Sequence, residues 1–310
     1  MMRFAMGRLL IAIPVLLGVS IVAFLIIHLI PGNPAQAMLF GSNPTPTQIH
    51  DLEVRLGLDQ PLYQQYGKYL VGLVHGDLGT SFVTGRGVFS EIVSRAPSTF
   101  VLSGSAMLIA IVVGVPLGIV GGVRPGSFWD RAGRVISVSG VAIPYFWLAL
   151  LFVLIFAVRL RLVPAVGTQG FSSLILPAVA LGWGYAAILT RLVRSRLIEE
   201  YQDEYIKTAR AKGCGETRVL LNHALRNAVI PTITMLGLQI GNILTGAAAI
   251  EVIFGRPGLG SFLVQSIAAK NIPVVQGAVL FIGVAYVLIN LVVDMLVGVI
   301  DPRTRKQVTV

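Results

Sequence analysis

Charged side chains are scarce in this sequence, and cysteine is almost absent. Charged residues make up 12% of the 310 positions, against roughly 25% in an average soluble domain. Cys214 is the single cysteine, which excludes an internal disulfide. We expect its thiol to stay reduced, without a redox role.

Catalytic and metal-binding patterns are also missing. The histidines are scattered through the chain, at His28, His50, His75 and His223. The sequence contains no HExxH motif, no Cys/His cluster and no nameable nucleophile-and-base arrangement. We therefore expect no metal, no cofactor and no enzyme activity in this chain.

Two glycine-containing stretches match nucleotide-binding patterns only by letter. Gly182-x-Gly184-x-x-Ala187 lies inside an apolar run with no strand before it. The segment GRPGLGS, residues 255–261, lacks the lysine and the strand-to-helix context of a phosphate-binding loop. The chain therefore shows no nucleotide site of its own.

Apolar residues, by contrast, are abundant. They account for 55% of the sequence, and the mean hydropathy is +0.81, values that indicate an integral membrane protein. The net charge of +10 is typical of basic residues in cytoplasmic loops. No aromatic-and-basic motif supports the alternative of nucleic-acid binding.

Six apolar runs predict six membrane-spanning helices. The first, 9–30, follows Arg3 and Arg8 and is longer than the about 7–15 residues of a signal-peptide core. We interpret it as an uncleaved helix, although Ala35-Gln36-Ala37 resembles a cleavage site. The other runs are 99–123, 135–158, 173–192, 228–250 and 274–300.

Charge placement predicts a cytoplasmic-membrane protein with both termini in the cytoplasm. Arginine and lysine concentrate in the loops that this orientation places inside, notably at 124–134, 191–226 and 303–306. Arg159 and Arg161, in a short outer loop, are exceptions. We divide the chain into a tail and first helix (1–30), an extracytoplasmic insert (31–97) and a core domain (98–310).

The insert should be a small folded unit, because it is too long for a simple connection. Residues 47–56 predict a short helix, with Thr47 as a candidate N-cap and Gly57 at its end. Residues 61–74 predict a second helix. Its tyrosines, Tyr63, Tyr66 and Tyr69, are expected against the membrane surface, with ligand contact as the alternative.

Glycines repeat at helical spacing in two of the runs. Gly114, Gly118 and Gly122 lie four residues apart, as do Gly237 and Gly241. This spacing favours close helix packing, within the chain or with a partner membrane subunit, although glycine is common in membrane helices.

Asp294 is the one carboxylate well inside an apolar run, with Asn290 one turn earlier. Charges at such positions are often functional. We favour a structural interpretation, a carboxylate near the cytoplasmic interface paired with a basic residue, because Asp301 and Arg303 follow closely.

The longest polar stretch in the C-terminal half, 199–231, lies between two apolar runs. It runs from an acidic start to a basic end, and Ile206, Ala209, Arg210 and Gly213 share one face of a predicted helix. A second short helix is predicted over 216–227, with Pro231 shaping entry into the next membrane helix. We expect a docking surface for another subunit; a solvated connection is the alternative.

The same stretch carries a resemblance to a known family. EYIKTARAKGCGETRVLLNHALRNAVIP is similar to the EAA coupling loop of ABC importer permeases of the DppB/OppB type, the dipeptide, oligopeptide and nickel uptake class. Thr208, Lys207 and Arg226 replace residues of the broader pattern, as is typical of the peptide branch. By this resemblance, the ATPase-coupling residues are Glu204, Tyr205, Lys207, Thr208, Ala209, Ala211, Lys212 and Gly213.

The resemblance covers nearly the whole chain. It includes RLLIAIPVLLGVSIVAFLIIHLIPGNPA with Asn33 for the usual Asp, LGLDQPLYQQYGKYL, GDLGTSF, EVIFGRPGLG, Asn271 for the usual Asp, and the closing DPR. It implies a type I ABC importer fold and a pathway shared with a DppC/OppC-type permease. Cytoplasmic ATPases and an extracytoplasmic binding protein are implied partners. Peptides are the leading substrate class; nickel or metal chelates, glutathione and sugars stay open. A secondary transporter, a channel or a membrane enzyme is less well supported.

Overall fold

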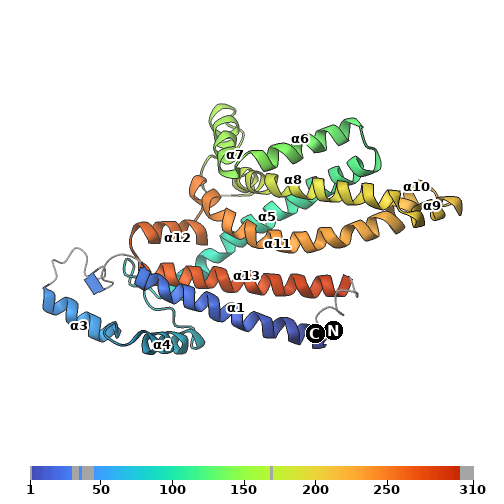
Figure 1. The fold of residues 1–310 in the computed structure, drawn as a ribbon. Coiled ribbons are helices and arrows are strands. Elements are labelled where there is room, and N and C mark those ends of the chain that lie inside the picture. Colours follow the sequence, from blue (N-terminus) through green and yellow to red (C-terminus); the bar gives the residue numbers. More distant parts are fainter. Residues whose placement is uncertain (1, 30–34, 37–44, 168–169, 301–310) are drawn as a thin grey trace. The chain divides into compact units, whose positions relative to one another are not determined.

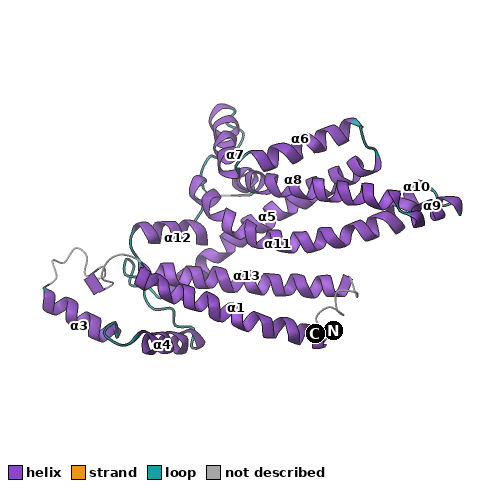
Figure 2. Ribbon diagram, viewed as in Figure 1, coloured by secondary structure: helices purple, strands orange, loops and turns teal. Residues whose placement is uncertain are grey.

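The protein is almost wholly helical over the residues that the structure describes, which are 2–29, 35–36, 45–167 and 170–300 of a computed structural model (Figures 1 and 2). The predicted PGNP turn at 31–34 and the closing DPR at 301–303 lie outside the described residues. Within these described ranges, five helices are long and apolar enough to cross a membrane: α1 (Met2–Leu29), α5 (Val88–Val123), α8 (Ser172–Gln202), α11 (Leu225–Ile253) and α13 (Ile272–Ile300).

The sixth predicted span, 135–158, is not one helix. It consists of α6 (Phe128–Ala142) and α7 (Tyr145–Phe152), continued by the π-helical segment η1 (Val153–Arg159), with a bend of 107° between the two parts. Pro144 explains the break, because a residue that precedes proline is disfavoured in the helical conformation. Ile143 is accordingly extended, at φ −97° and ψ 120°. Counted as one broken span, this pair completes the expected six-helix, all-α membrane fold.

The helices pack into two compact units that do not follow chain order. Unit 1 contains 1–8, 99–256 and 289–310; unit 2 contains 9–98 and 257–288. The second membrane helix, expected to begin at 99, begins at Val88 instead. Its first turns carry charge yet are anchored within unit 2, where the Arg95 guanidinium stacks 3.9 Å from the Phe262 ring centroid. The charge therefore did not mark the end of the helix.

Helix α8 is the centre of unit 1. Helices α6, α7 and α11 all pack against it, and Figure 1 shows α6 and α8 running side by side. The largest buried cluster of this unit contains Leu181, Ile243, Ile250 and Phe254. Movement of α8 would therefore disturb most of the packing in unit 1.

The glycines of α5 allow it to approach α8 closely. A Cβ atom at Gly114 would lie 2.6 Å from the Ala186 carbonyl oxygen, and one at Gly118 would lie 2.7 Å from the Val193 Cβ. Gly122 continues the same contact against Leu197. In this chain the repeat is thus an internal packing face, since no larger side chain fits there.

The second glycine pair lies on α11. A Cβ atom at Gly237 would collide with Val293 of α13, and Gly241 is buried. Both glycines belong to unit 1.

Unit 2 contains two short helices from the insert. Helix α3 (Pro46–Leu56) begins one residue earlier than expected, and its N-cap is Thr45 rather than Thr47. Thr45 and Gln48 form a reciprocal capping box, and Pro46 occupies the first turn, where its missing N–H costs nothing. Gly57 ends the helix in the left-handed conformation, as expected.

Helix α4 (Leu62–Val74) packs on α1 through two of its tyrosines. The Tyr66 and Tyr69 rings lie 5.3 and 5.8 Å from the Phe24 ring, and the Tyr66 hydroxyl is 2.8 Å from Ser20 Oγ. These two tyrosines therefore contact the chain's own first helix, whereas Tyr63 is exposed. A further helix of this unit, α12 (Leu259–Ala268), was not predicted.

Candidate functional site

The polar stretch 199–231 forms a short turn-and-helix unit between α8 and α11. Residues 199–202 still belong to α8, and α9 (Glu204–Ala211) follows after Asp203. The expected separate helix over 216–227 is wrong. From Glu216 the chain is helical without interruption through α10 (Glu216–Arg218), η2 (Val219–Ala224) and α11. Pro231 lies inside α11, where neighbouring helices and π-type segments accommodate a proline.

Helix α9 is amphipathic, and its apolar face is buried within unit 1. Ile206 is fully buried and Ala209 nearly so. They pack in a cluster with Val193 and Leu197 of α8 and with Val219. Helix α9 is therefore attached to the ends of both α8 and α11, and it cannot swing independently of them without exposing this cluster.

The turn after α9 has the hydrogen bonds of a Schellman motif. The Gly213 amide donates to the Arg210 carbonyl at 2.9 Å, and the Cys214 amide donates to the Ala209 carbonyl at 3.2 Å. Gly213 has a φ of +82°, which glycine adopts without steric cost. Cys214 packs near Ala209 in the same cluster, which is the apolar contact that usually accompanies this motif.

A bidentate ion pair closes the turn across the chain. Arg210 Nε donates to Glu216 Oε1 at 2.7 Å, and its Nη2 donates to Glu216 Oε2 at 3.0 Å. The hydrogen bond from Arg210 lowers the pKa of the Glu216 carboxyl. This pair links α9 to α10, so the segment between them, 212–215, is held at both ends.

A second polar cluster ties the start of α9 to its neighbours. The Tyr205 hydroxyl donates to Glu200 Oε2, and Asn227 Nδ2 donates to the Tyr205 hydroxyl at 3.0 Å. Burial, followed by the hydrogen bond to Glu200, raises the pKa of Tyr205 to about 12. Glu200, Tyr205 and Asn227 come from α8, α9 and α11, so one hydroxyl joins three helices.

The structure separates the predicted coupling residues into two groups. Ala209 faces inward and contributes to the buried cluster. The other seven predicted coupling residues are exposed at the surface of the unit: Glu204, Tyr205, Lys207, Thr208, Ala211, Lys212 and Gly213. Of the face predicted from spacing, Ile206 and Ala209 point into the core, while Arg210 and Gly213 remain at the surface.

Several residues that shape this site were not among the predicted coupling residues. Arg210 pairs with Glu216 across a turn, six residues away, and no helical period connects the two. Glu200 and Asn227 meet at Tyr205 although they are 27 residues apart. Only the alternation of acidic and basic residues in the stretch hinted at such pairs.

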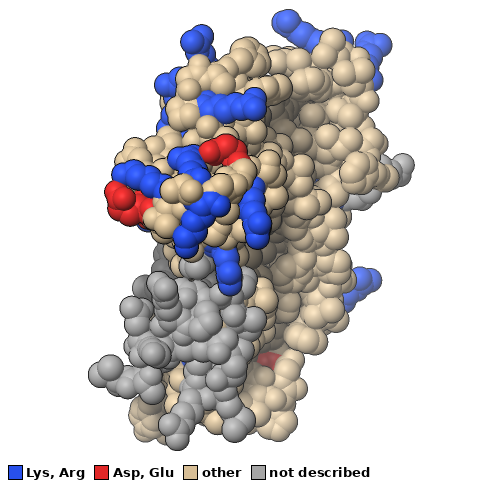
Figure 3. Space-filling model, turned by 90° about the vertical axis from the view of Figure 1, so that its right-hand side faces the viewer, with Lys and Arg blue, Asp and Glu red and all other residues tan. Residues whose placement is uncertain are grey.

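Basic side chains predominate on this end of unit 1. Figure 3 looks onto the end that carries α9 and α10, and Lys and Arg side chains gather there with few acidic ones. Exposed members include Lys207, Arg210, Lys212, Arg218 and Arg226. Two of the acidic residues in this stretch, Glu204 and Glu216, are already paired with Lys207 and Arg210.

Asp294 has a basic partner within unit 1. Its Oδ2 lies 3.0 Å from Arg8 Nη1. The expected pairing with a basic residue is present, and the partner comes from the N-terminal helix. Asp301 and Arg303, which prompted that expectation, lie outside the described residues.

No group of three His, Cys, Asp or Glu side chains that could hold a metal ion occurs within the described ranges. Gly182 and Gly184 lie inside α8. The segment 255–261 contains the N-cap of α12, where Ser261 Oγ accepts the Gly258 amide at 3.1 Å.

Comparison with known proteins gives matches over almost the whole chain. Residues 114–306 match the family described as "Binding-protein-dependent transport system inner membrane component", and residues 1–103 match the corresponding N-terminal family. The chain is 42% identical to the dipeptide transport system permease protein DppB of Alkalihalophilus pseudofirmus, covering 98% of this chain and 100% of that protein.

Two further proteins are similar. The glutathione transport system permease protein GsiC of Escherichia coli K12 is 40% identical, over 98% of this chain and 99% of the relative. Among solved structures, an inward-facing form of the MetNI methionine ABC transporter aligns with a TM-score of 0.58 at 19% identity, covering 68% of this chain and 96% of the other. The last likeness concerns the fold alone.

Proposed function

The chain belongs to the family of binding-protein-dependent transport system inner membrane components, and from this premise we propose that it is the translocating permease of an ATP-driven peptide importer. It is a multi-pass inner-membrane subunit rather than an enzyme. Its pathway is shared with a second permease of the DppC/OppC type. An extracytoplasmic binding protein delivers the substrate, and cytoplasmic ATPases supply the energy.

The observation that carries this proposal is the attachment of α9. Its outer face is exposed, while Ile206 and Ala209 fasten it to α8 and α11. The Arg210–Glu216 pair and the Schellman turn hold its far end. A displacement of α9 by a docked ATPase would therefore pass to α8, against which α6, α7 and α11 pack. Rigid attachment is what such coupling requires.

Each exposed residue then has a place in the docking surface. Glu204, Lys207, Thr208, Ala211 and Lys212 offer side chains to the ATPase, Tyr205 positions the start of α9, and Gly213 allows the turn to be approached closely. Ala209 acts from inside, by seating the helix. With this docking surface on the cytoplasmic side, we propose that both termini lie in the cytoplasm as well.

The extracytoplasmic insert 31–97 is proposed as the contact for the binding protein. Helix α3 carries polar and charged residues on a capped, exposed helix. Deleting 47–56 should weaken the affinity of the binding protein for the importer. Unchanged affinity after this deletion would count against the role.

The substrate class follows from the relatives. One is named for dipeptide transport and another for glutathione, itself a short peptide. We propose di- and oligopeptides as the substrates, with glutathione as the second candidate. Nickel or metal chelates and sugars remain alternatives within the same importer class.

The test is uptake of a labelled dipeptide into vesicles that contain both permeases and the ATPases, with the binding protein outside and ATP inside. Uptake should require ATP and the binding protein, and unlabelled peptides should compete more strongly than glutathione, nickel or sugars. Uptake driven by an ion gradient without ATPases would contradict the proposal. A secondary transporter needs a free charge along its pathway, and the one candidate, Asp294, is paired with Arg8.

A further inference from the structure

Helix α6 has one face that packs on α8 and an opposite face that carries an open groove. On the packed face, Gly133 and Asp130 are buried, and Arg194 of α8 binds the Asp130 carboxylate at 2.6 Å. The groove, of about 560 Å³, is lined by residues of α6 alone: Arg131, Arg134, Val135, Val138 and Ser139. These positions recur at helical spacing, so they form one continuous stripe.

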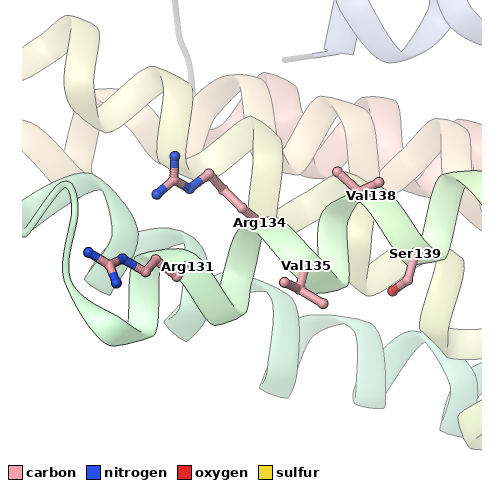
Figure 4. A pocket seen from close by; sticks show the side chains of 5 residues that line it. All are labelled: Arg131, Arg134, Val135, Val138 and Ser139. Atoms are coloured by element: carbon pink, nitrogen blue, oxygen red, sulfur yellow. The ribbon is translucent and has the colours of Figure 1, made fainter.

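The stripe is divided into a basic end and an apolar end. Figure 4 shows the arginine side chains extending toward the first turn of α6, with Val135 and Val138 following farther along the helix. Val135 and Val138 are 68% and 69% exposed. The one hydroxyl in the stripe is already engaged, because Ser139 Oγ accepts a hydrogen bond from Trp183 Nε1 at 3.3 Å.

The positive charge at the basic end is only partly balanced by the protein, because one carboxylate, Asp130, is shared by Arg134 and Arg194. Within the described part of the chain, the Arg131 side chain has neither an ion-pair nor a hydrogen-bond partner. Arg134 lies 3.6 Å from Asp130, but that carboxylate already accepts hydrogen bonds from Arg194 and from the Gly126 amide. Two guanidinium groups are therefore available to an anion.

The first turn of α6, at the basic end, carries exposed aromatic side chains. Phe128 and Trp129, in the first turn of α6, form an exposed edge-to-face pair with ring centroids 5.6 Å apart. Exposed aromatic rings of this kind mark the headgroup level of a bilayer. Beyond the headgroup level, exposed valines are compatible with the hydrocarbon of lipid tails. At the headgroup level, the planar guanidinium groups of the two arginines can bind a phosphate diester.

We propose that this groove binds one anionic phospholipid, such as phosphatidylglycerol. Arg131 and Arg134 hold the phosphate, and one acyl chain lies along Val135 and Val138. A second permease is the other conceivable occupant of an exposed helix face. The excess positive charge decides between them, because a protein interface would leave two guanidinium groups to be desolvated unless acidic partners met both.

The experiment uses the importer purified with its partner subunits. Native mass spectrometry measures binding of phosphatidylglycerol and of phosphatidylcholine with identical acyl chains. The variants are Arg131→Gln, Arg134→Gln and the double variant, all at exposed positions. Arg226→Gln, which removes the same charge from α11 away from the groove, is the matched control.

The wild-type importer should prefer phosphatidylglycerol. Each single arginine variant should lower the affinity for this lipid roughly fivefold, and the double variant about 30-fold, the effect expected for one and two basic residues at an anionic surface. The control should change it less than about twofold by the same rule. Val138→Trp should weaken binding of both lipids, because it fills the apolar end.

Three results would overturn the proposal. The first is equal binding of the two lipids by the wild type, or an unchanged preference in the double variant. The second is displacement of the lipid by soluble glycerophosphoglycerol at equal concentration, because the apolar end would then contribute nothing. The third is efficient cross-linking of a Val138→Cys variant to the second permease, which would make the stripe a subunit interface.

Discussion

Gly213 offers a direct test of the docking surface, because the structure separates the cost of its backbone from the cost of a bulky side chain. Its φ of +82° lies in the left-handed region, where a residue with a Cβ is disfavoured by about 1–2 kcal/mol. A Cβ atom built there meets nothing within 4 Å. Gly213→Ala and Gly213→Trp should therefore destabilise the permease alone by nearly the same amount.

The two variants should differ only in the presence of the ATPase. We expect Gly213→Ala to retain most of its ATP-driven uptake, since the strain of about 1–2 kcal/mol is confined to one turn. Gly213→Trp should assemble in the membrane but lose uptake by an order of magnitude or more, because the indole occupies the space that the partner needs. ATP hydrolysis should continue without transport.

Uptake and ATP hydrolysis are measured in the same vesicles, and thermal unfolding is measured on the permease itself. Gly126 provides the calibration for backbone strain. It has the same φ of +82° and equally open surroundings but lies in the turn between α5 and α6, so Gly126→Ala should shift the melting temperature as Gly213→Ala does. Equal uptake by Gly213→Trp and Gly213→Ala would refute the docking role of this turn.

Three further predictions concern packing, charge and pH. Gly118→Val should lower the free energy of unfolding by about 1–3 kcal/mol through overpacking against α8, which a lower melting temperature would show. In the control Gly104→Ala, on the same helix, the added Cβ atom meets nothing within 4 Å, so the melting temperature should change little. Asp294→Asn should lower thermal stability but leave uptake intact, because the carboxylate serves to pair Arg8; a loss of uptake at unchanged stability would instead make Asp294 part of the pathway. Tyr205 has a folded-state pKa of about 12, above the ordinary value of 10.0. The stability that it contributes should therefore be complete below pH 10 and fall as the pH rises toward 12. The difference in tyrosinate absorbance between the wild type and Tyr205→Phe, followed against pH, measures this pKa.

Much of the fold could be predicted from local pattern. The apolar runs located five spanning helices and the broken pair α6–α7, and Gly57 and Pro61 correctly bounded the insert helices. The errors arose where local signals competed. Thr45 caps α3 in place of Thr47, because Pro46 suits the first turn and Gln48 completes the capping box. Helix α5 continues through charged residues, because unit 2 provides partners for them.

The coupling stretch shows the same limit in more detail. The sequence alone showed that this stretch is polar and that it lies between two apolar spans. Helical periodicity placed Ala209 and Arg210 together on one face, but it could not tell which of them faces the core. The buried cluster draws Ala209 inward, while Arg210 turns toward Glu216, a partner that only the folded turn brings within reach.

By itself, the sequence determined that this is a helical membrane protein with up to six apolar spans and a polar stretch before α11. Each crossing of the hydrocarbon layer requires about 20 successive apolar residues, and such a run can be recognised from the local sequence alone. The tertiary structure determined which residues each helix face contacts. It set the glycines of α5 against α8, paired Arg8 with Asp294 across the length of the chain, and seated α9 on two membrane helices. These contacts join residues far apart in sequence, so no local pattern specifies them.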